Sequence, residues 1–159
     1  MTTSSVTSSA ITAGRSLHLV DIENLVGDPR ADGAAVLATL DRYLSAARWI
    51  PGDHVILAAN PRLMEKVIFD LPVPANVHCA PGRDGADGKL LDAVHPHTIC
   101  TRYNRLVIGS GDGIFGDRAH AVRDRGVEVD VVAPRGGCSY RLWGFAPTLI
   151  DPADFVLAA

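Results

Sequence analysis

The stretch Leu17-His18-Leu19-Val20-Asp21 introduces the pattern from which the fold can be inferred. Its largely apolar residues predict a short buried strand that ends at an aspartate. Apolar residues then recur at spacings of three and four, as on one face of an amphipathic helix. They are Val36, Leu37, Leu40, Tyr43, Leu44 and Ala47. A strand followed by a helix is the unit that the rest of the chain repeats.

The same alternation continues to the end of the chain. Further strands are predicted over residues 55–58, 76–80, 106–108 and 127–132, with residues 148–150 as the candidate for a sixth. Helices are predicted over residues 63–68, near Lys89 and over residues 114–125. Pro96 interrupts or kinks the second of these helices. The alternation predicts a doubly wound α/β fold, in which a mostly parallel sheet of five or six strands has helices on both faces.

The composition fits one globular domain. The chain has 159 residues, of which 47% are hydrophobic, enough for a core without disulfides or a structural metal. We assign residues 17–159 to this single domain. Residues 1–16, rich in serine and threonine, are assigned to a disordered tail, with a transit peptide as the alternative. No apolar run approaches the roughly 18 residues of a membrane span, so we expect no membrane partner.

The cysteines and the charge narrow the class of protein. Cys79, Cys100 and Cys138 are too few and too widely spaced for a disulfide framework or a cysteine zinc site. Reduced thiols indicate a cytoplasmic protein. The formal net charge of −3 argues against a strongly basic nucleic-acid-binding coat, although a local basic rim around an acidic centre is compatible with it.

Acidic residues occupy the positions at which this fold class binds ligands. In open α/β sheets, ligands lie beyond the carboxyl ends of the strands, where the strand order reverses. Asp21 ends the first strand and Asp112 follows the fourth, so the two share one crevice if these strands are neighbours. Further acidic candidates are Asp84, Asp87, Asp92 and Asp117. Carboxylates that converge repel one another, and Mg²⁺ or Mn²⁺, which prefer oxygen ligands, would relieve that repulsion.

Two other interpretations of these residues are open. A single aspartate after a strand is often only a helix cap or a turn former. The glycines Gly111, Gly113 and Gly116 also match a dinucleotide-binding fingerprint, with Asp130 as the acidic residue further along. In that interpretation Asp112 would place a negative charge beside the pyrophosphate, and Asp130 falls inside a predicted strand rather than at its end.

Three motifs, in order, resemble those of the NYN domain family of the PIN-like nuclease superfamily. They are Leu19-Val20-Asp21-Ile22-Glu23-Asn24-Leu25, Gly85-Ala86-Asp87-Gly88-Lys89-Leu90-Leu91-Asp92 and Val107-Ile108-Gly109-Ser110-Gly111-Asp112-Gly113-Ile114-Phe115. The closing Ala153-Asp154-Phe155 is similar to the family's last segment. The resemblance covers most of residues 17–156 and implies a PIN-like, Rossmann-like fold.

The same resemblance implies a function. It indicates a ribonuclease that depends on Mg²⁺ or Mn²⁺ and acts on RNA. Asp21, Asp87 and Asp112 would be its catalytic, metal-binding carboxylates, with Asn24 as a supporting polar residue. We expect Ser110, in the late motif, to support the site as well.

One position departs from the family's pattern. The late motif usually carries a second acid two residues after the first, where this chain has Ile114. Loss of that carboxylate removes a metal ligand or a hydrogen-bond acceptor. Asp92 and Asp117 are the candidates for additional metal ligands. The alternative function is a catalytically impaired module that binds RNA or protein.

Cations that contact an RNA backbone are expected beside the acidic centre. The candidates are Arg83, Lys89, Arg118, Arg135 and Arg141. RNA is therefore the expected partner. The sequence sets no oligomeric state, and a homodimer is compatible with it.

Overall fold

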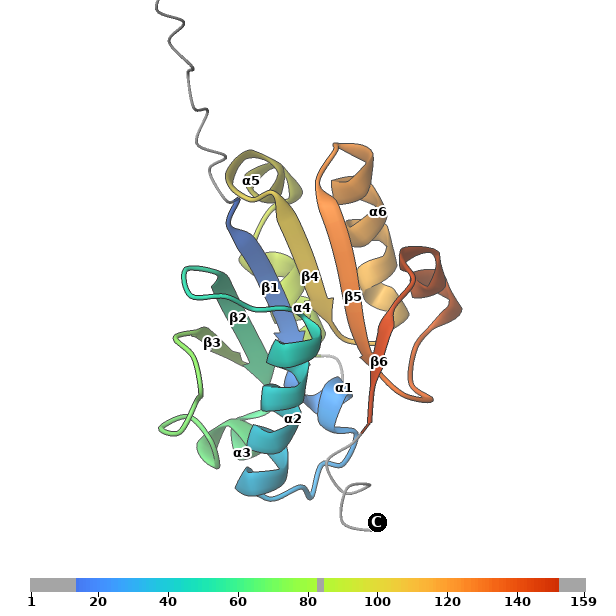
Figure 1. Ribbon diagram of the computed structural model, residues 1–159. Helices are drawn as coiled ribbons and strands as arrows, with labels where there is room; N and C mark the ends of the chain where they lie inside the picture. Colours follow the sequence, from blue (N-terminus) through green and yellow to red (C-terminus); the bar gives the residue numbers. More distant parts are fainter. Residues whose placement is uncertain (1–13, 83–84, 152–159) are drawn as a thin grey trace, which may run out of the picture.

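The computed structural model describes residues 14–82 and 85–151, which form a six-stranded sheet (Figure 1). The strand order is β3-β2-β1-β4-β5-β6, and each of these neighbours pairs in parallel. The strands are β1 (Ser16–Asp21), β2 (His54–Ala59), β3 (Asn76–Cys79), β4 (Arg105–Gly109), β5 (Glu128–Pro134) and β6 (Thr148–Ile150). The predicted doubly wound α/β fold is confirmed, and its sheet has the larger of the two expected sizes.

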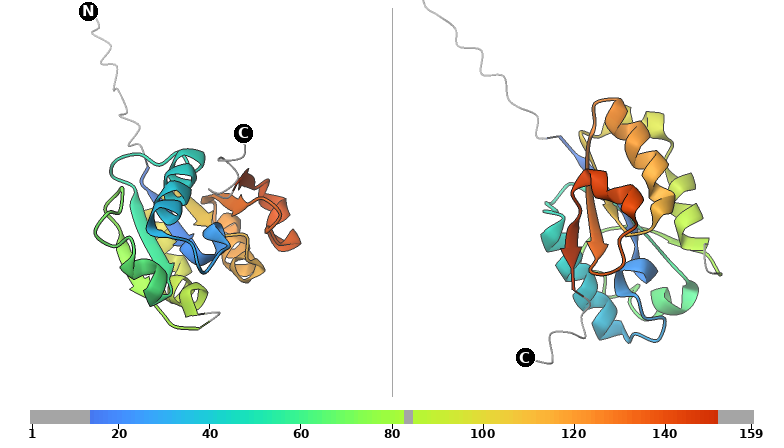
Figure 2. Two further views of the ribbon diagram at one scale, coloured as in Figure 1. Left: turned by 90° about the horizontal axis from the view of Figure 1, so that it is seen from below. Right: turned by 90° about the vertical axis from the view of Figure 1, so that its right-hand side faces the viewer.

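Helices cover both faces of the sheet, as the side view in Figure 2 shows. One face is covered by α1 (Ile22–Val26), α2 (Gly33–Ala46) and α3 (Pro61–Glu65). The other is covered by α4 (Gly85–Ala93), α5 (Pro96–Arg102) and α6 (Gly116–Asp124), together with the 3₁₀ turns η1 (Gly113–Phe115) and η2 (Tyr140–Phe145).

The side chains of β1 alternate between these two layers. Leu17 and Leu19 belong to the core under α4, α5 and α6, whereas Val20 belongs to the core under α1, α2 and α3. All three side chains are fully buried, because a central parallel strand has no face toward water. Burial of each leucine contributes roughly 2 kcal/mol to folding.

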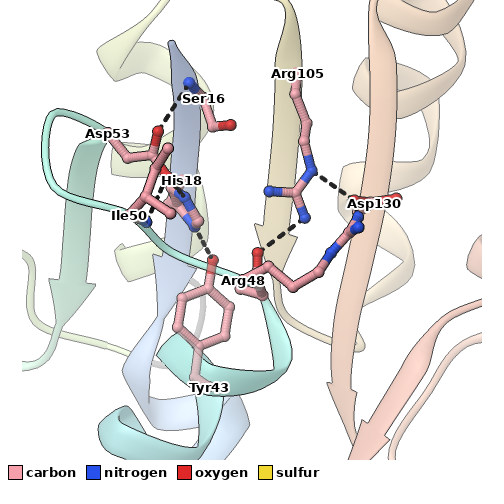
Figure 3. A network of polar contacts seen from close by, with 9 residues as sticks. Ser16, His18, Tyr43, Arg48, Ile50, Asp53, Arg105 and Asp130 are labelled. Carbon is pink, nitrogen blue, oxygen red and sulfur yellow. Dashed lines mark hydrogen bonds and ion pairs between the residues drawn. The ribbon is translucent and has the colours of Figure 1, made fainter. Parts of the chain in front are cut away.

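A buried polar network fastens the start of β1 to the segment between α2 and β2 (Figure 3). His18 lies in the core, with Nδ1 2.9 Å from the hydroxyl of Tyr43 and Nε2 3.2 Å from Oδ2 of Asp53. Asp53 also accepts hydrogen bonds from the backbone N–H groups of Ser16 and Ile50, each at 3.1 Å. Burial lowers the pKa of His18, although Asp53 acts in the opposite direction. The polar groups that β1 buries are therefore paired, as folding requires.

Several elements differ from the sequence prediction, and three of the differences have a clear cause. The helix expected over residues 63–68 ends at Glu65, because the next two N–H groups bond to carbonyls only three residues back. Pro96 begins a separate helix, α5, as a first-turn residue behind the capping side chain of His95. The five-residue helix α1 was not predicted, because so short a segment shows no helical period.

Some sequence predictions fall on residues that the structure does not describe. Most of the tail assigned to residues 1–16, the cation Arg83, Asp84 and the closing Ala153-Asp154-Phe155 lie outside the described residues. Within residues 14–82 and 85–151, no helix has the length and apolar character that crossing a membrane requires.

Candidate functional site

The strand order reverses between β1 and β4, and the three predicted catalytic aspartates meet there. β1 and β4 are neighbours, as the sequence analysis required, with Val20 opposite Gly109. The left panel of Figure 2 looks onto this end of the sheet. A cavity of about 300 Å³ lies at this end and is lined by Asp21, Glu23, Asn24, Gly27, Asp87 and Asp112.

Helix α1 begins directly after β1, and Asp21 is its cap. The Oδ1 atom of Asp21 accepts a hydrogen bond from the backbone N–H of Asn24 at 3.2 Å. Gly27 ends the helix with a φ of 72°, which is the left-handed conformation that favours glycine. The single turn between these residues directs Glu23 and Asn24 into the same cavity as Asp21.

The loop after β4 is tied to the loop after β1. The backbone N–H of Gly111 donates to Oδ1 of Asn24 at 2.7 Å. Ser110 is fully buried, and its hydroxyl oxygen accepts from the backbone N–H of Asp112 at 3.1 Å. The Oδ1 atom of Asp112 in turn accepts from the N–H of Ile114 at 3.0 Å. Asn24 and Ser110 therefore position the backbone that carries Asp112, a role consistent with the expectation for both.

Asp87 comes from the opposite layer, in the first turn of α4. Asp21 and Asp87 are 3% and 6% exposed, and their side chains are hydrogen-bonded to each other. Two carboxylates can form such a bond only when one of them carries a proton. A proton held in this way lowers the repulsion between the two groups when no cation is bound.

Burial and the neighbouring acids raise the pKa of Asp21 to about 8. Loss of hydration is the largest cause, followed by the hydrogen bond to Asp87 and the negative charge of that residue. Glu23 acts in the same direction, and the N–H of Asn24 opposes it. Raised pKa values of buried carboxyl groups in a cavity are common at functional sites, which makes Asp21 a candidate functional residue.

The donor set is suited to a hard divalent cation. All the charged groups that line the cavity are carboxylates, the ligand type that Mg²⁺ and Mn²⁺ prefer. In residues 14–82 and 85–151, no three acidic, histidine or cysteine side chains are close enough together to hold one ion directly. Mg²⁺ commonly binds to one or two protein carboxylates and keeps several waters. Asp21 and Asp87 provide such a pair, with Asp112 in the same cavity.

Asp92 and Asp117, the candidates for additional ligands, do not line this cavity. Asp92 is exposed on α4. Asp117 is exposed on α6, and its carboxylate accepts a hydrogen bond from Arg141 at 2.7 Å. Neither residue brings a further carboxylate to the cavity, and the side chain of Asp117 is paired with the arginine instead.

The predicted RNA-binding cations have different surroundings. Three of them are engaged within the protein. Arg118 donates to the carbonyls of Leu91 and Val94 at 2.8 and 2.6 Å, which fastens α6 to the end of α4. Arg135 is paired with Asp151 at 2.6 Å, and Arg141 with Asp117. Lys89 is exposed on α4 and has no polar partner within the described part of the chain.

Glu23 is the residue of this site that the sequence analysis missed. It lies two residues after Asp21 in the first motif, beyond the point at which the predicted strand ends. It belongs to the short helix α1, which was not predicted, and it lines the cavity. Its Oε1 atom accepts a hydrogen bond from the backbone N–H of Asn60, the residue that caps α3. An acid in the first turn after a capping aspartate was the available signal.

The glycines of the dinucleotide fingerprint have a structural explanation. A Cβ at Gly111 would lie 1.9 Å from the carbonyl oxygen of Gly137, and one at Gly113 would lie 2.7 Å from the hydroxyl of Ser139. The chain after β5 therefore packs directly against these glycines. Asp130 accepts hydrogen bonds from two arginine side chains, at 2.6 and 3.2 Å. These contacts explain why Gly111, Gly113 and Asp130 occupy their positions, and no bound dinucleotide is needed to explain them.

Comparisons with known proteins bear on the fold. No family model matches the chain, and no curated protein matches it. Among solved structures, the chain is similar to a protein of unknown function from Vibrio parahaemolyticus. The TM-score is 0.57 at 17% identity, over 88% of this chain and 95% of that chain. This similarity, together with the six-stranded parallel sheet, shows a doubly wound α/β fold.

Proposed function

We propose that the protein is a divalent-metal-dependent ribonuclease that hydrolyses RNA phosphodiester bonds at Asp21, Asp87 and Asp112. One observation carries the proposal: carboxylates from β1, α4 and the loop after β4 line one cavity at the strand-order reversal. The resemblance of the same three segments to NYN-domain motifs supports the proposal. A set of carboxylate ligands also suits Mg²⁺ and Mn²⁺, the cations that the proposal requires.

Asp21 and Asp87 would hold the cation, with Asp112 reaching it directly or through water. A divalent ion supplies charge that lowers the pKa of an attacking water and neutralises the phosphate. The residues described as lining the cavity include no serine, cysteine, histidine or lysine. Water is therefore the nucleophile that this site would use. The carboxylates also orient that water by accepting its hydrogen bonds.

RNA is the partner in this proposal, and the cytoplasm is its compartment. Lys89 follows Asp87 by two residues and its ammonium group is uncommitted within the described part of the chain, so it is available to a phosphate. Cys79, Cys100 and Cys138 are free thiols, as expected in a reducing compartment. A homodimer is compatible with the exposed Trp143 and Leu149 beside the edge strand β6.

A second candidate function is a module that binds RNA or protein without catalysis. Ile114 stands where the family's late motif carries an acid, and its side chain is 43% exposed. The neighbouring carboxylate, Asp112, is partly occupied as the acceptor of the Ile114 N–H. Both facts weaken a site that already depends on a pair of carboxylates for direct coordination.

Cleavage of end-labelled single-stranded and hairpin RNAs, with Mn²⁺, Mg²⁺ or EDTA, distinguishes the two candidates. The nuclease requires cleavage that depends on the metal and is lost in Asp112→Asn. Asp92→Asn is the matched control, because Asp92 is exposed and outside the cavity, and it should retain activity. Equal background cleavage by wild type and Asp112→Asn would contradict the nuclease, and retention of RNA on a filter would then support the binding module.

A further inference from the structure

A second cavity adjoins the carboxylate cavity and shares one residue with it. This second cavity has a volume of about 440 Å³ and is lined by Glu23, Asn60, Pro61, Arg62, Pro81 and Gly82. Glu23 also lines the cavity that holds Asp21, Asp87 and Asp112. The volume falls within the roughly 300–1,000 Å³ of pockets that hold small ligands. A group bound there would be next to whatever occupies the carboxylate site.

The lining of this second cavity has the groups that a nucleotide needs. Arg62 is exposed, and its guanidinium has no hydrogen bond or ion pair within residues 14–82 and 85–151. Asn60 uses its Oδ1 atom to cap α3 by accepting from Leu63 N–H at 2.9 Å, which leaves the amide N–H₂ available. Pro61 and Pro81 add rigid apolar rings. An uncommitted cation, an amide donor and apolar surface match a phosphate, a polar edge and the faces of a sugar or base.

Glu23 lies between the two cavities in a fixed orientation. Its Oε1 atom accepts the N–H of Asn60, and its Oε2 atom has no hydrogen-bond partner among the described residues. The side chain is half-buried, so a hydroxyl group that reaches Oε2 would form a charge-assisted hydrogen bond. A phosphate would instead be repelled by this carboxylate. The group that Glu23 selects is therefore a neutral donor.

The charged side chains also indicate on which side of the carboxylate cavity an RNA strand would lie. On the side of the site nearer β5, Arg135 and Arg141 are paired with Asp151 and Asp117. On the side nearer β2, Arg62 is uncommitted within the described residues. A phosphodiester strand that passes the carboxylates therefore finds an available cation beyond Glu23.

We propose that the second cavity binds the ribonucleotide next to the scissile phosphate, and that Glu23 accepts a hydrogen bond from its ribose 2′-hydroxyl. Arg62 contacts the phosphate of that nucleotide, and the proline rings flank its sugar or base. Because only RNA has the 2′-hydroxyl, Glu23 is a specificity-determining residue for RNA over DNA. This inference rests on the proposed nuclease function and adds the residue that selects the sugar.

The test compares an RNA with the same oligonucleotide carrying a single 2′-deoxy sugar on either side of the cleaved bond. For the wild type, one of the two deoxy positions should lower kcat/KM by about tenfold, the effect of one lost hydrogen bond to a charged group. In Glu23→Ala the ratio of kcat/KM for the all-ribose RNA to that for the deoxy-substituted RNA should fall to near one. In Glu23→Gln the amide oxygen stays on the Asn60 N–H and the amide N–H₂ takes the place of Oε2, where it can donate to the hydroxyl oxygen, so part of the ratio should be retained. The ratio is taken within each variant, so any general loss of activity cancels.

Control variants separate specificity from other effects. Glu128→Ala, at the opposite end of the sheet, should leave the ratio as in the wild type. Arg62→Ala should raise KM with little change in kcat, and Arg102→Ala, an exposed arginine on α5, should change neither. An unaltered ratio in Glu23→Ala overturns the assignment of Glu23, even if the enzyme is an active nuclease.

A binding experiment keeps the two proposals distinguishable. If the wild type cleaves no RNA, the nuclease proposal fails, and titration of AMP and dAMP by NMR tests the second cavity by itself. Tighter binding of AMP than of dAMP in the wild type, lost in Glu23→Ala, supports the 2′-hydroxyl contact. Equal affinities for the two nucleotides in the wild type overturn it.

Discussion

The side chain of Asn24 and the backbone of Gly111 are joined by a hydrogen bond of 2.7 Å, which links the loop after β1 to the loop after β4. These residues are 87 positions apart in the chain. The bond holds together two loops that carry Asp21 and Asp112 from different strands. It is therefore the contact that sets the distance between two of the proposed catalytic carboxylates.

Removal of this contact should lower both the stability and the activity of the protein. The loss of activity should be the larger effect. Asn24→Ala leaves the N–H of Gly111 without its acceptor, so we expect the free energy of unfolding to fall by about 1–2 kcal/mol. Metal-dependent cleavage should fall by at least about tenfold, because Asp112 loses its position. Urea unfolding and initial rates measure the two effects. Asn104→Ala, at an exposed side chain, is the control, and equal losses in both variants would contradict this role.

The paired acids Asp21 and Asp87 should make the metal-free protein less stable at high pH. The pKa of Asp21 is about 8 in the folded protein, against about 3.9 in an unfolded chain. Between these values the folded state holds a proton that the unfolded state lacks, so the free energy of unfolding decreases as pH rises and the loss is complete above the folded pKa. Thermal unfolding in EDTA should show a lower Tm near pH 9 than near pH 5. The Tm should fall by roughly 2–4 °C for each 1 kcal/mol lost from the free energy of unfolding.

Asp87→Asn tests the cause of that pH dependence. An amide keeps the shape and the hydrogen bond but carries no charge, so the variant should be more stable than the wild type near pH 9 in EDTA. Its metal-dependent activity should be lost. The same Tm difference between low and high pH in both proteins would show that Asp87 makes no contribution to the dependence.

Gly111 should tolerate no side chain, whereas Gly88 should. A Cβ at Gly111 would lie 1.9 Å from the carbonyl oxygen of Gly137, so Gly111→Ala must move the backbone after β5. We expect a loss of about 2–4 kcal/mol. Gly88 lies within α4 and has nothing within 4 Å of its Cβ position, so Gly88→Ala should stabilise the protein by up to about 1 kcal/mol. Urea denaturation measures both, and similar values for the two variants would contradict the close packing.

An acid at position 114 should strengthen metal binding. Ile114 is 43% exposed, so Ile114→Asp should change the free energy of unfolding by no more than about 0.5 kcal/mol. The added carboxylate is two residues from Asp112, whose Oδ1 atom accepts from the backbone N–H of this position, and we expect the affinity for Mn²⁺, measured by calorimetry, to rise several-fold. Ile68→Asp makes the same change at a side chain that is 40% exposed and outside the cavity. A rise in both variants would indicate a general effect of charge rather than a new ligand.

The network around His18 should be essential for stability rather than for catalysis. Asp53→Ala removes the acceptor of two backbone N–H groups and of the buried imidazole, which should cost about 3 kcal/mol or more. Asp41→Ala, at an exposed residue of α2, should cost no more than about 0.5 kcal/mol. At a temperature where the Asp53→Ala protein is still folded, its cleavage rate should be close to that of wild type. A selective loss of cleavage by the folded variant would contradict this separation.

The strands could be inferred because each follows from a local pattern, whereas their order in the sheet could not, and the adjacency of the first and fourth strands was only a condition of the argument. The strand predicted over residues 148–150 coincides with β6, and those at 55–58 and 106–108 lie inside β2 and β4. Each is a short apolar or β-branched run between turn residues, so no distant contact is needed to recognise it. The rule that ligands bind at the reversal of strand order then singled out Asp21 and Asp112.

The surroundings of the long polar side chains could not be inferred in this way. Arg118 follows Asp117 in the sequence, yet its guanidinium reaches the carbonyls of Leu91, in α4, and Val94, just after α4. Glu23 lines the site as a residue of α1, a helix too short to be recognised from periodicity. Such contacts depend on the placement of elements relative to one another, and periodicity in the sequence carries no information about it.

The strand order has a consequence for biosynthesis. β1 is the first strand to be made, yet it lies in the middle of the sheet and pairs on one side with β4, Ser16 opposite Arg105. While the ribosome adds the residues between β3 and β4, the emerged part can pair β1 with β2 and β2 with β3, but the other edge of β1 stays open. An apolar open edge is a template for pairing with other chains. The interval before β4 emerges is thus when the nascent chain is most exposed to aggregation.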